Sequence, residues 1–250
     1  MTLWHNRIGK PSVIDRAIRR IWPIPPSPSP KTKDDEATLR LVPSDAFTER
    51  MLELLHDLKQ LSPSPLGDYV EFGVYNGTSM SCVYSALSRM HINHVRLFGF
   101  DSFQGLPKDV QSEDGGVFHA GQFCCPKDVA MLNLTHHGVP ADRISLIEGW
   151  YRDTLVGPPA AYGINRISLA LIDCDTYNSA RLALRFIYPA LDTTSALIFD
   201  DWKLNDLDIL GMGEFRAFNE FLDDHPDVQV TPMRGYSRKS KIFVLKKPLP

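Results

Sequence analysis

The sequence lacks the features that mark membrane-spanning and secreted proteins. No apolar run approaches the roughly 20 residues that a membrane-spanning helix needs. The N-terminal stretch MTLWHNRIGKPSVIDRAIRRIW has no apolar core of the secretory type. These absences predict a cytoplasmic protein that has no membrane partner.

Cysteine is scarce, and neither sign of charge is in large excess. The four cysteines show neither metal-finger spacing nor the framework of a small disulfide-rich domain, so reduced thiols are expected. They are Cys82, Cys124, Cys125 and Cys174. The formal net charge of −3 gives the whole protein no attraction to nucleic acid or to an anionic membrane.

The sequence does contain enough apolar residues for one sizeable α/β domain. It has 250 residues, of which 43% are hydrophobic and 23% are charged. We assign this domain to residues 36–250. Residues 1–35 form a separate N-terminal segment, in which residues 1–22 are predicted as a short basic amphipathic helix and residues 23–34 as a Pro/Ser-rich linker.

Hydrophobic periodicity predicts alternating helices and strands along the domain. Strands are expected at 68–74, 96–102, 143–149, 167–175 and 195–202. Helices are expected at 44–60, with Ser44 as its N-cap, and at 79–90, 127–137, 178–190 and 213–223. Segments 228–233 and 241–247 are expected to be antiparallel strands. The pattern is typical of an α/β fold with a Rossmann-like, doubly wound, mostly parallel sheet and a C-terminal antiparallel strand pair.

An acidic residue stands at the end of each expected parallel strand. These acids are Glu71, Asp101, Glu148, Asp173 and Asp200. In a doubly wound sheet, ligands bind beyond the carboxyl ends of the strands. The chemistry of the protein is therefore expected at this edge of the sheet.

The turn after the first expected strand, VEFGVYNGTS, contains two glycines. Its pattern E-x-G-x-x-x-G, formed by Glu71, Gly73 and Gly77, is neither the dinucleotide fingerprint nor a phosphate-binding loop. Glycines allow a tight turn and close approach of the backbone to a ligand. An acid here repels a diphosphate but suits a cation such as S-adenosylmethionine, with its sulfonium and ammonium groups. A plain turn with two glycines is the alternative.

Two further strand ends fit a ligand that contains adenosine. Asp101 follows the second expected strand, where such folds bind ribose hydroxyls through two accepted hydrogen bonds. A helix-capping aspartate is the alternative. Glu148 and Trp150 follow the third strand and place an acid and an aromatic ring near the expected adenine, although Trp150 fits a core position equally well.

Carboxylates gather at the ends of the fourth and fifth expected strands. Asp173, Asp200 and Asp201 follow apolar strands, so these acids need a cation, protons or basic partners. Hard oxygen ligands favour Mg²⁺ or another hard divalent cation over zinc. The alternative is that Asp175 and Asp201 cap helices, and Arg181 and Arg185 are further candidates to neutralise the charge.

Five segments in the same order and spacing make the chain resemble the macrocin O-methyltransferase family, whose members methylate sugar hydroxyls on macrolide and related antibiotics. They are VEFGVYNGTS, FGFDSFQGLP, EGWYRDTL, LIDCDTYNSARLALRFIYPAL and ALIFDDW, and the resemblance covers roughly residues 45–247. It implies a class I fold that binds S-adenosylmethionine, a divalent metal (usually Mg²⁺), and a homodimer or higher homo-oligomer.

The resemblance also implies site residues. Those assigned to the cofactor are Glu71, Gly73, Tyr75, Gly77, Thr78, Ser79, Asp101, Ser102, Glu148, Gly149, Trp150 and Asp173. Asp173, Asp200 and Asp201 are implied as metal ligands, with Asp173 also as the catalytic base. The expected reaction is direct in-line transfer of the methyl group to a hydroxyl of a small-molecule acceptor. Cys174 stands where the family usually has glycine.

The resemblance fades in residues 108–137, a long glycine-containing segment beside the expected site. Long segments of this kind are often lids or binding loops. We expect acceptor contacts from Phe118, His119, Gln122 and Phe123, and a structural insertion or oligomer contact is an equal alternative.

Other functions stay open from the sequence alone. The acceptor hydroxyl could be phenolic rather than part of a sugar. A metal-dependent hydrolase would use the same acids, although no phosphate cradle is evident. A non-catalytic S-adenosylmethionine-binding scaffold is the third alternative, and the intact acids argue against it.

Overall fold

The structure is a computed structural model that describes residues 42–62, 64–108, 110 and 118–248. The predicted basic helix and linker in residues 1–35 lie outside these described residues. Within them, no helix is both long and apolar enough to cross a membrane.

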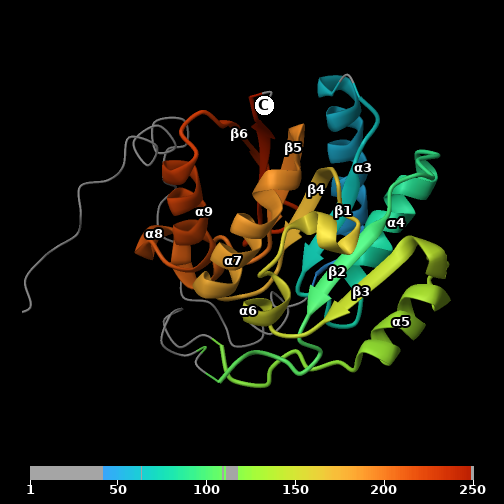
Figure 1. The fold of residues 1–250 in the computed structure, drawn as a ribbon, viewed down its shortest axis with the longest axis horizontal. Coiled ribbons are helices and arrows are strands. Elements are labelled where there is room, and N and C mark those ends of the chain that lie inside the picture. Colours follow the sequence, from blue (N-terminus) through green and yellow to red (C-terminus); the bar gives the residue numbers. More distant parts are fainter. Residues whose placement is uncertain (1–41, 63, 109, 111–117, 249–250) are drawn as a thin grey trace, which may run out of the picture.

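One seven-stranded sheet forms the centre of the described chain, in the order β3-β2-β1-β4-β5-β7-β6 (Figure 1). Its strands are β1 (Asp68–Phe72), β2 (Leu97–Asp101), β3 (Ile144–Glu148), β4 (Ile167–Ile172), β5 (Leu191–Phe199), β6 (Gln229–Arg234) and β7 (Lys241–Lys246). Strands β1 to β5 pair in parallel, and β7 pairs antiparallel with both β5 and β6. The predicted doubly wound sheet with a C-terminal antiparallel pair is confirmed.

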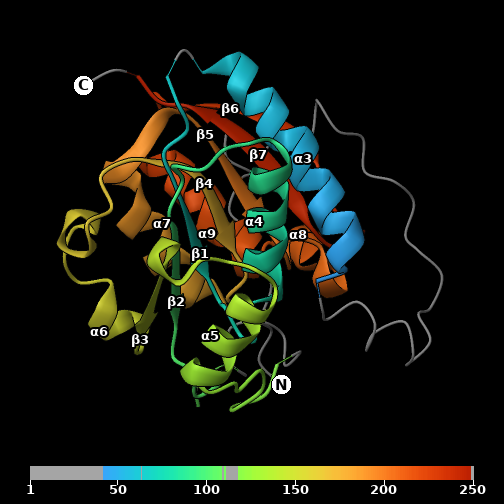
Figure 2. The same cartoon turned by 90° about the vertical axis from the view of Figure 1, so that its right-hand side faces the viewer.

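Helices cover both faces of the sheet (Figure 2). They are α3 (Ser44–Leu61), α4 (Thr78–Arg89), α5 (Lys127–His136), α6 (Tyr151–Thr154), α7 (Tyr177–Ile187), α8 (Leu207–Leu210) and α9 (Gly213–Asp224). Side chains of β4 alternate between two hydrophobic clusters: Leu169 and Leu171 pack with α3, α4 and α5, whereas Ala170 and Ile172 pack with α7 and α9. The two cores therefore lie on opposite faces.

Two local predictions were wrong. Ser44 is the first residue of α3 rather than its N-cap, which is Pro43, and no side chain caps this helix. Strand β5 begins at Leu191 and not at residue 195. Its polar start is stabilised because Asp192 accepts a hydrogen bond from Ser168 and pairs with Arg166, so this polar segment continues the strand.

Candidate active site

A cavity of about 1270 Å³ opens where the loops leave the carboxyl ends of β1, β2, β3 and β4. Single small-molecule sites occupy roughly 300–1,000 Å³, so this volume exceeds that of a usual single-ligand site. Nine of the residues that the sequence assigned to the cofactor line it: Gly73, Tyr75, Thr78, Ser79, Asp101, Ser102, Gly149, Trp150 and Asp173. Glu71, Gly77 and Glu148 do not line it.

Gly73 allows the turn after β1 to run against the end of β4. Its φ of +93° lies in the left-handed region, and a Cβ atom there would stand 1.7 Å from the carbonyl oxygen of Asp173. The backbone N–H of Gly73 donates to Phe100 O, and that of Asp173 donates to Phe72 O. The absence of a side chain at Gly73 thus sets the distance between the glycine turn and Asp173.

Glu71 lies beneath this turn and is fully buried. Its two oxygens accept hydrogen bonds from the hydroxyls of Ser79 and Tyr69, each at 2.5 Å. Burial is the largest influence on the carboxyl and raises the pKa of Glu71 from 4.5 to about 8, against the opposing effect of the two hydroxyl donors. Glu71 does not line the cavity itself, but its hydrogen-bond partner Ser79 does.

Asp101 organises the backbone at the end of β2. One carboxylate oxygen accepts the N–H groups of Val74 (2.8 Å) and Tyr75 (2.9 Å), and the other accepts the N–H of Phe103 (2.7 Å). A carboxylate offers about four acceptor positions, so three are used and about one remains. Asp101 therefore holds the loops around the cavity and has less capacity for two ribose hydroxyls than the sequence suggested.

Trp150 and Glu148 differ in their relation to the cavity. Trp150 is half-buried, lines the cavity and belongs to neither large hydrophobic cluster, so it is not the core residue that the sequence left as an alternative. Glu148 is exposed at the end of the edge strand β3 and does not face the cavity. The aromatic ring, and not the acid, is the available contact here.

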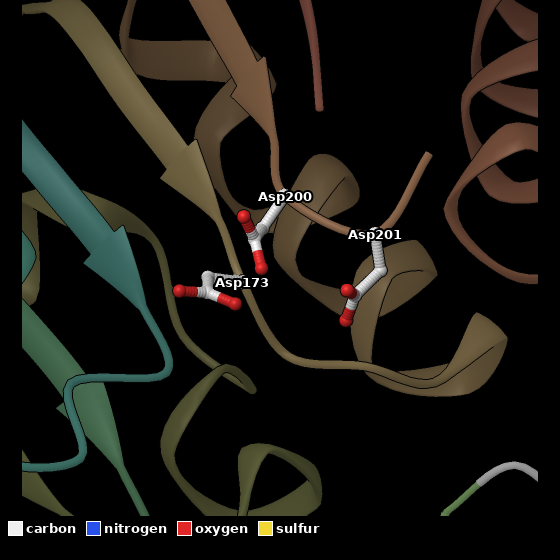
Figure 3. Close-up of side chains that lie close together, drawn as sticks. All are labelled: Asp173, Asp200 and Asp201. Atoms are coloured by element: carbon white, nitrogen blue, oxygen red, sulfur yellow. The ribbon is translucent and has the colours of Figure 1, made fainter. Parts of the chain in front are cut away.

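The sheet brings Asp173, Asp200 and Asp201 together (Figure 3). One carboxylate oxygen from each lies within 4.8 Å of the others. Asp173 is half-buried and lines the cavity, whereas Asp200 and Asp201 are 1% and 2% exposed. Burial first, and then the neighbouring charges of Asp200 and Asp201, hold the pKa of Asp173 well above its usual range.

A buried lysine neutralises part of this acidic cluster. The ammonium group of Lys239 donates to Asp200 Oδ2 (2.5 Å) and to Asp201 Oδ1 (2.9 Å). The hydroxyl of Tyr236 donates to the other oxygen of Asp200. Burial lowers the pKa of Lys239, but Asp201, Asp200 and Asp173 outweigh it and hold the pKa well above its usual range.

Sequence reasoning missed Lys239 and Tyr236 and named Arg181 and Arg185 instead, both of which are exposed. The predicted antiparallel pairing of the last strand could have indicated both residues. Strand β7 runs antiparallel to β5 with Lys241 opposite Phe199, so residues just before β7 necessarily meet residues just after β5.

Two further acids, Glu214 and Asp175, lie next to the cluster. Glu214, fully buried at the start of α9, accepts the backbone N–H of Asp201 (3.0 Å) through Oε2, and its Oε1 has no hydrogen-bond partner. Burial, followed by the charge of Asp201, raises the pKa of both Glu214 and Asp175. Asp175 is not the cap of α7, because Thr176 accepts the N–H of Ser179 in that role.

Described residues in the long segment 108–137 form part of the cavity wall. Gln122 and Phe123 line the cavity as expected. Phe118 does not: it is 1% exposed and packs against Leu204 and Leu207. His119 does not line the cavity either. The expected acceptor contacts therefore reduce to Gln122 and Phe123.

Comparison with known families gives one match that covers most of the chain. The family model described as Macrocin-O-methyltransferase (TylF) matches residues 46–233. This range includes the glycine turn, the strand ends and all three acids of the cluster.

Two curated relatives are similar to this chain. One is the 8-demethyl-8-(2,3-dimethoxy-alpha-L-rhamnosyl)-tetracenomycin-C 4'-O-methyltransferase of Streptomyces olivaceus, 30% identical over 175 residues, which are 65% of each chain. The other is the mycinamicin III 3''-O-methyltransferase of Micromonospora griseorubida, 25% identical over 173 residues, 64% of this chain and 66% of the relative. The chain thus spans slightly less than two thirds of the length of both relatives.

Among solved structures, the O-methyltransferase NovP superposes with a TM-score of 0.64. The match covers 79% of this chain and 78% of that one at 20% sequence identity. At this identity the similarity establishes a shared fold and no more.

Proposed function

The chain belongs to the macrocin O-methyltransferase family, and from that membership we propose that it transfers a methyl group from S-adenosylmethionine to a hydroxyl of a small-molecule natural product. The observation that carries the proposal is the cavity at the carboxyl edge of the sheet, which nine of the expected cofactor residues line. A sugar hydroxyl is the preferred acceptor, since the relative from Streptomyces olivaceus is named for methylation of a rhamnosyl compound.

The methyl donor is proposed to lie over the glycine turn and along the ends of β1, β2 and β3. Gly73, which lies against the backbone of Asp173, lines this wall together with Ser79, which donates a hydrogen bond to Glu71. The half-buried ring of Trp150 offers a stacking surface for adenine. Gln122 and Phe123 border the remaining volume, which we assign to the acceptor.

Asp173 is the proposed base. In direct in-line transfer, a bond forms between the acceptor oxygen and the methyl carbon while the bond between that carbon and the sulfonium sulfur breaks. The hydroxyl proton passes to the carboxylate of Asp173, which acts as the general base. Asp173 is the member of the acid cluster that lines the cavity.

The acid cluster also fits a hard divalent cation such as Mg²⁺. Asp173, Asp200 and Asp201 offer three carboxylate oxygens within 4.8 Å of one another, the donor type that Mg²⁺ prefers. A bound Mg²⁺ would lower the pKa of an acceptor hydroxyl and offset the negative charge. Lys239 and Tyr236 already donate to Asp200, so the ion and these donors draw on the same oxygens.

A mass-spectrometric assay of methyl transfer tests this function. Wild-type protein with S-adenosylmethionine and Mg²⁺ is offered matched panels of glycosylated natural products and simple phenols. Methylation of the glycosylated panel supports the proposal, and methylation of phenols alone moves the acceptor to that class. Asp173→Asn is expected to lower the rate by roughly 10²- to 10⁴-fold, as loss of a general base does.

We further propose that the protein works in the cytoplasm as a homodimer or larger homo-oligomer. All four cysteines are free thiols, which suits a reducing compartment. Family membership supports the assembly. Light scattering on the purified protein tests it, and a monomer at micromolar concentration would contradict it.

A further inference from the structure

Lys239 is placed in the acid cluster by a well-defined turn. It precedes β7, where the N–H of Ser237 donates to the hydroxyl of Ser240 (2.8 Å) and the N–H of Ser240 donates to that of Ser237 (3.1 Å). Its own carbonyl accepts the N–H of Lys203 (2.8 Å). Lys239 is 5% exposed, so its ammonium group is committed to the interior of the protein.

The ammonium group uses the carboxylates that a metal would need. Both oxygens of Asp200 accept hydrogen bonds, one from Lys239 and one from Tyr236. Asp201 Oδ1 accepts from Lys239 as well. Of the three carboxylates, Asp173 alone receives no side-chain hydrogen bond among the described residues. A divalent ion that bound all three would therefore meet the Lys239 ammonium on two of them.

Two cations cannot share these oxygens at low cost. Mg²⁺ lies about 2.0–2.1 Å from its oxygen ligands, and Lys239 lies 2.5 and 2.9 Å from the same two carboxylates. The site is buried, so water screens their repulsion only weakly. The lysine stem is long and flexible, which gives its ammonium group an alternative position.

We propose that Lys239 is a built-in competitor of the divalent cation: its ammonium group and the metal ion alternate on the carboxylates of Asp200 and Asp201. Without metal, Lys239 neutralises the pair and keeps the site folded. When a metal ion binds, Lys239 withdraws from both aspartates. The inference rests on the proposed function for the assignment of these acids to a metal.

Mn²⁺ binding, followed by electron paramagnetic resonance of the free ion, tests the competition without reference to activity. Lys239→Met removes the ammonium and keeps the bulk of the stem. It is expected to bind Mn²⁺ at least about tenfold more tightly than the wild type, because the ion no longer displaces a cation. Lys246→Met is the matched control: it removes the same charge from an exposed position at the other end of β7, and its affinity should equal that of the wild type.

The proposal would be overturned if Lys239→Met bound Mn²⁺ no more tightly than the wild type does. It would also be overturned if neither protein bound Mn²⁺. If Lys239→Met does not fold, reductive methylation of wild-type lysines followed by mass spectrometry gives a second test. Saturating Mn²⁺ is expected to increase labelling of Lys239 several-fold and to leave Lys246 unchanged. Continued protection of Lys239 in the metal-bound protein would contradict the exchange.

Calorimetric titration of S-adenosylmethionine into the same samples separates this inference from the proposed function. If the wild type binds S-adenosylmethionine but Lys239→Met does not change the affinity for Mn²⁺, the proposed function is supported and the proposed competition is wrong. If Lys239→Met binds Mn²⁺ more tightly but the protein does not bind S-adenosylmethionine, the competition is supported and the proposed function is wrong.

Discussion

Burial sets the protonation of Glu71, the first acid of the glycine turn. The carboxyl group has no exposed surface, and its pKa rises from 4.5 to about 8, so the folded protein keeps a proton on it at neutral pH. The sequence identified Glu71 as a partner for a cationic ligand but gave no sign that Tyr69 and Ser79 would enclose it. Hydrogen bonds between residues on one strand face and on the next helix depend on tertiary packing, which a linear pattern does not contain.

Glu71→Gln should change how stability depends on pH. The pKa of Glu71 is higher in the folded protein than in the unfolded chain. The stability that this residue contributes is therefore fully present below about pH 4.5 and is lost as the pH rises toward 8. Glutamine does not titrate, so the free energy of unfolding of the variant should rise relative to that of the wild type across that range, by an upper bound of roughly 5 kcal/mol. Urea unfolding at a series of pH values measures the difference. A Glu71→Gln variant whose stability runs parallel to that of the wild type at every pH would contradict the assignment.

Trp150→Ala should weaken S-adenosylmethionine binding. Stacking of a base on an aromatic side chain contributes about 1–3 kcal/mol, so Kd should rise roughly 5- to 150-fold. Calorimetry measures it, with Leu210→Ala as a control that removes an exposed apolar side chain from α8. An unchanged Kd for Trp150→Ala would place adenine elsewhere in the cavity.

At the scale of elements, two loops join to form one side of the cavity. Leu106, in the loop after β2, donates its N–H to Gln122 O and accepts the N–H of Gly121, both at 2.9 Å. The sequence predicted the strands and most helices because their periodicity is local. It did not predict this pairing, since the loop residues carry no periodic pattern and Phe118 reads as an exposed aromatic until Leu204 and Leu207 are known to cover it.

Gly105→Ala tests the junction between these loops. Gly105 has a φ of +82°, and a Cβ atom would stand 2.6 Å from the carbonyl oxygens of Gly121 and Gln122. Gly138→Ala is a matched control, because Gly138 has a φ of +80° and a Cβ atom would meet nothing within 4 Å. Both variants suffer the backbone strain of about 1 kcal/mol, but Gly105→Ala should lose about 1–3 kcal/mol more in urea unfolding. Equal losses would show that the loops separate freely.

At the scale of the whole molecule, strand order decides which residues form the site. Strands β1 and β4 are neighbours in the sheet although about 95 residues separate them in the sequence, and this brings the glycine turn against Asp173. The rule that ligands lie at the carboxyl ends of parallel strands located the cavity from sequence alone. It did not show that Glu148 faces solvent, or that β7 returns a lysine and a tyrosine to the acids, because these depend on side-chain direction and on the path of the last turn.

Calorimetric titration of S-adenosylmethionine into the purified wild type, in the presence of Mg²⁺, shows directly whether the protein binds the methyl donor. We expect saturable binding with one molecule per chain. Asp101→Ala, which removes the acceptor of three backbone N–H groups around the cavity, should lose that binding. Asp142→Ala, which removes an exposed aspartate just before β3, should keep it. A folded wild type that binds no S-adenosylmethionine would contradict the account.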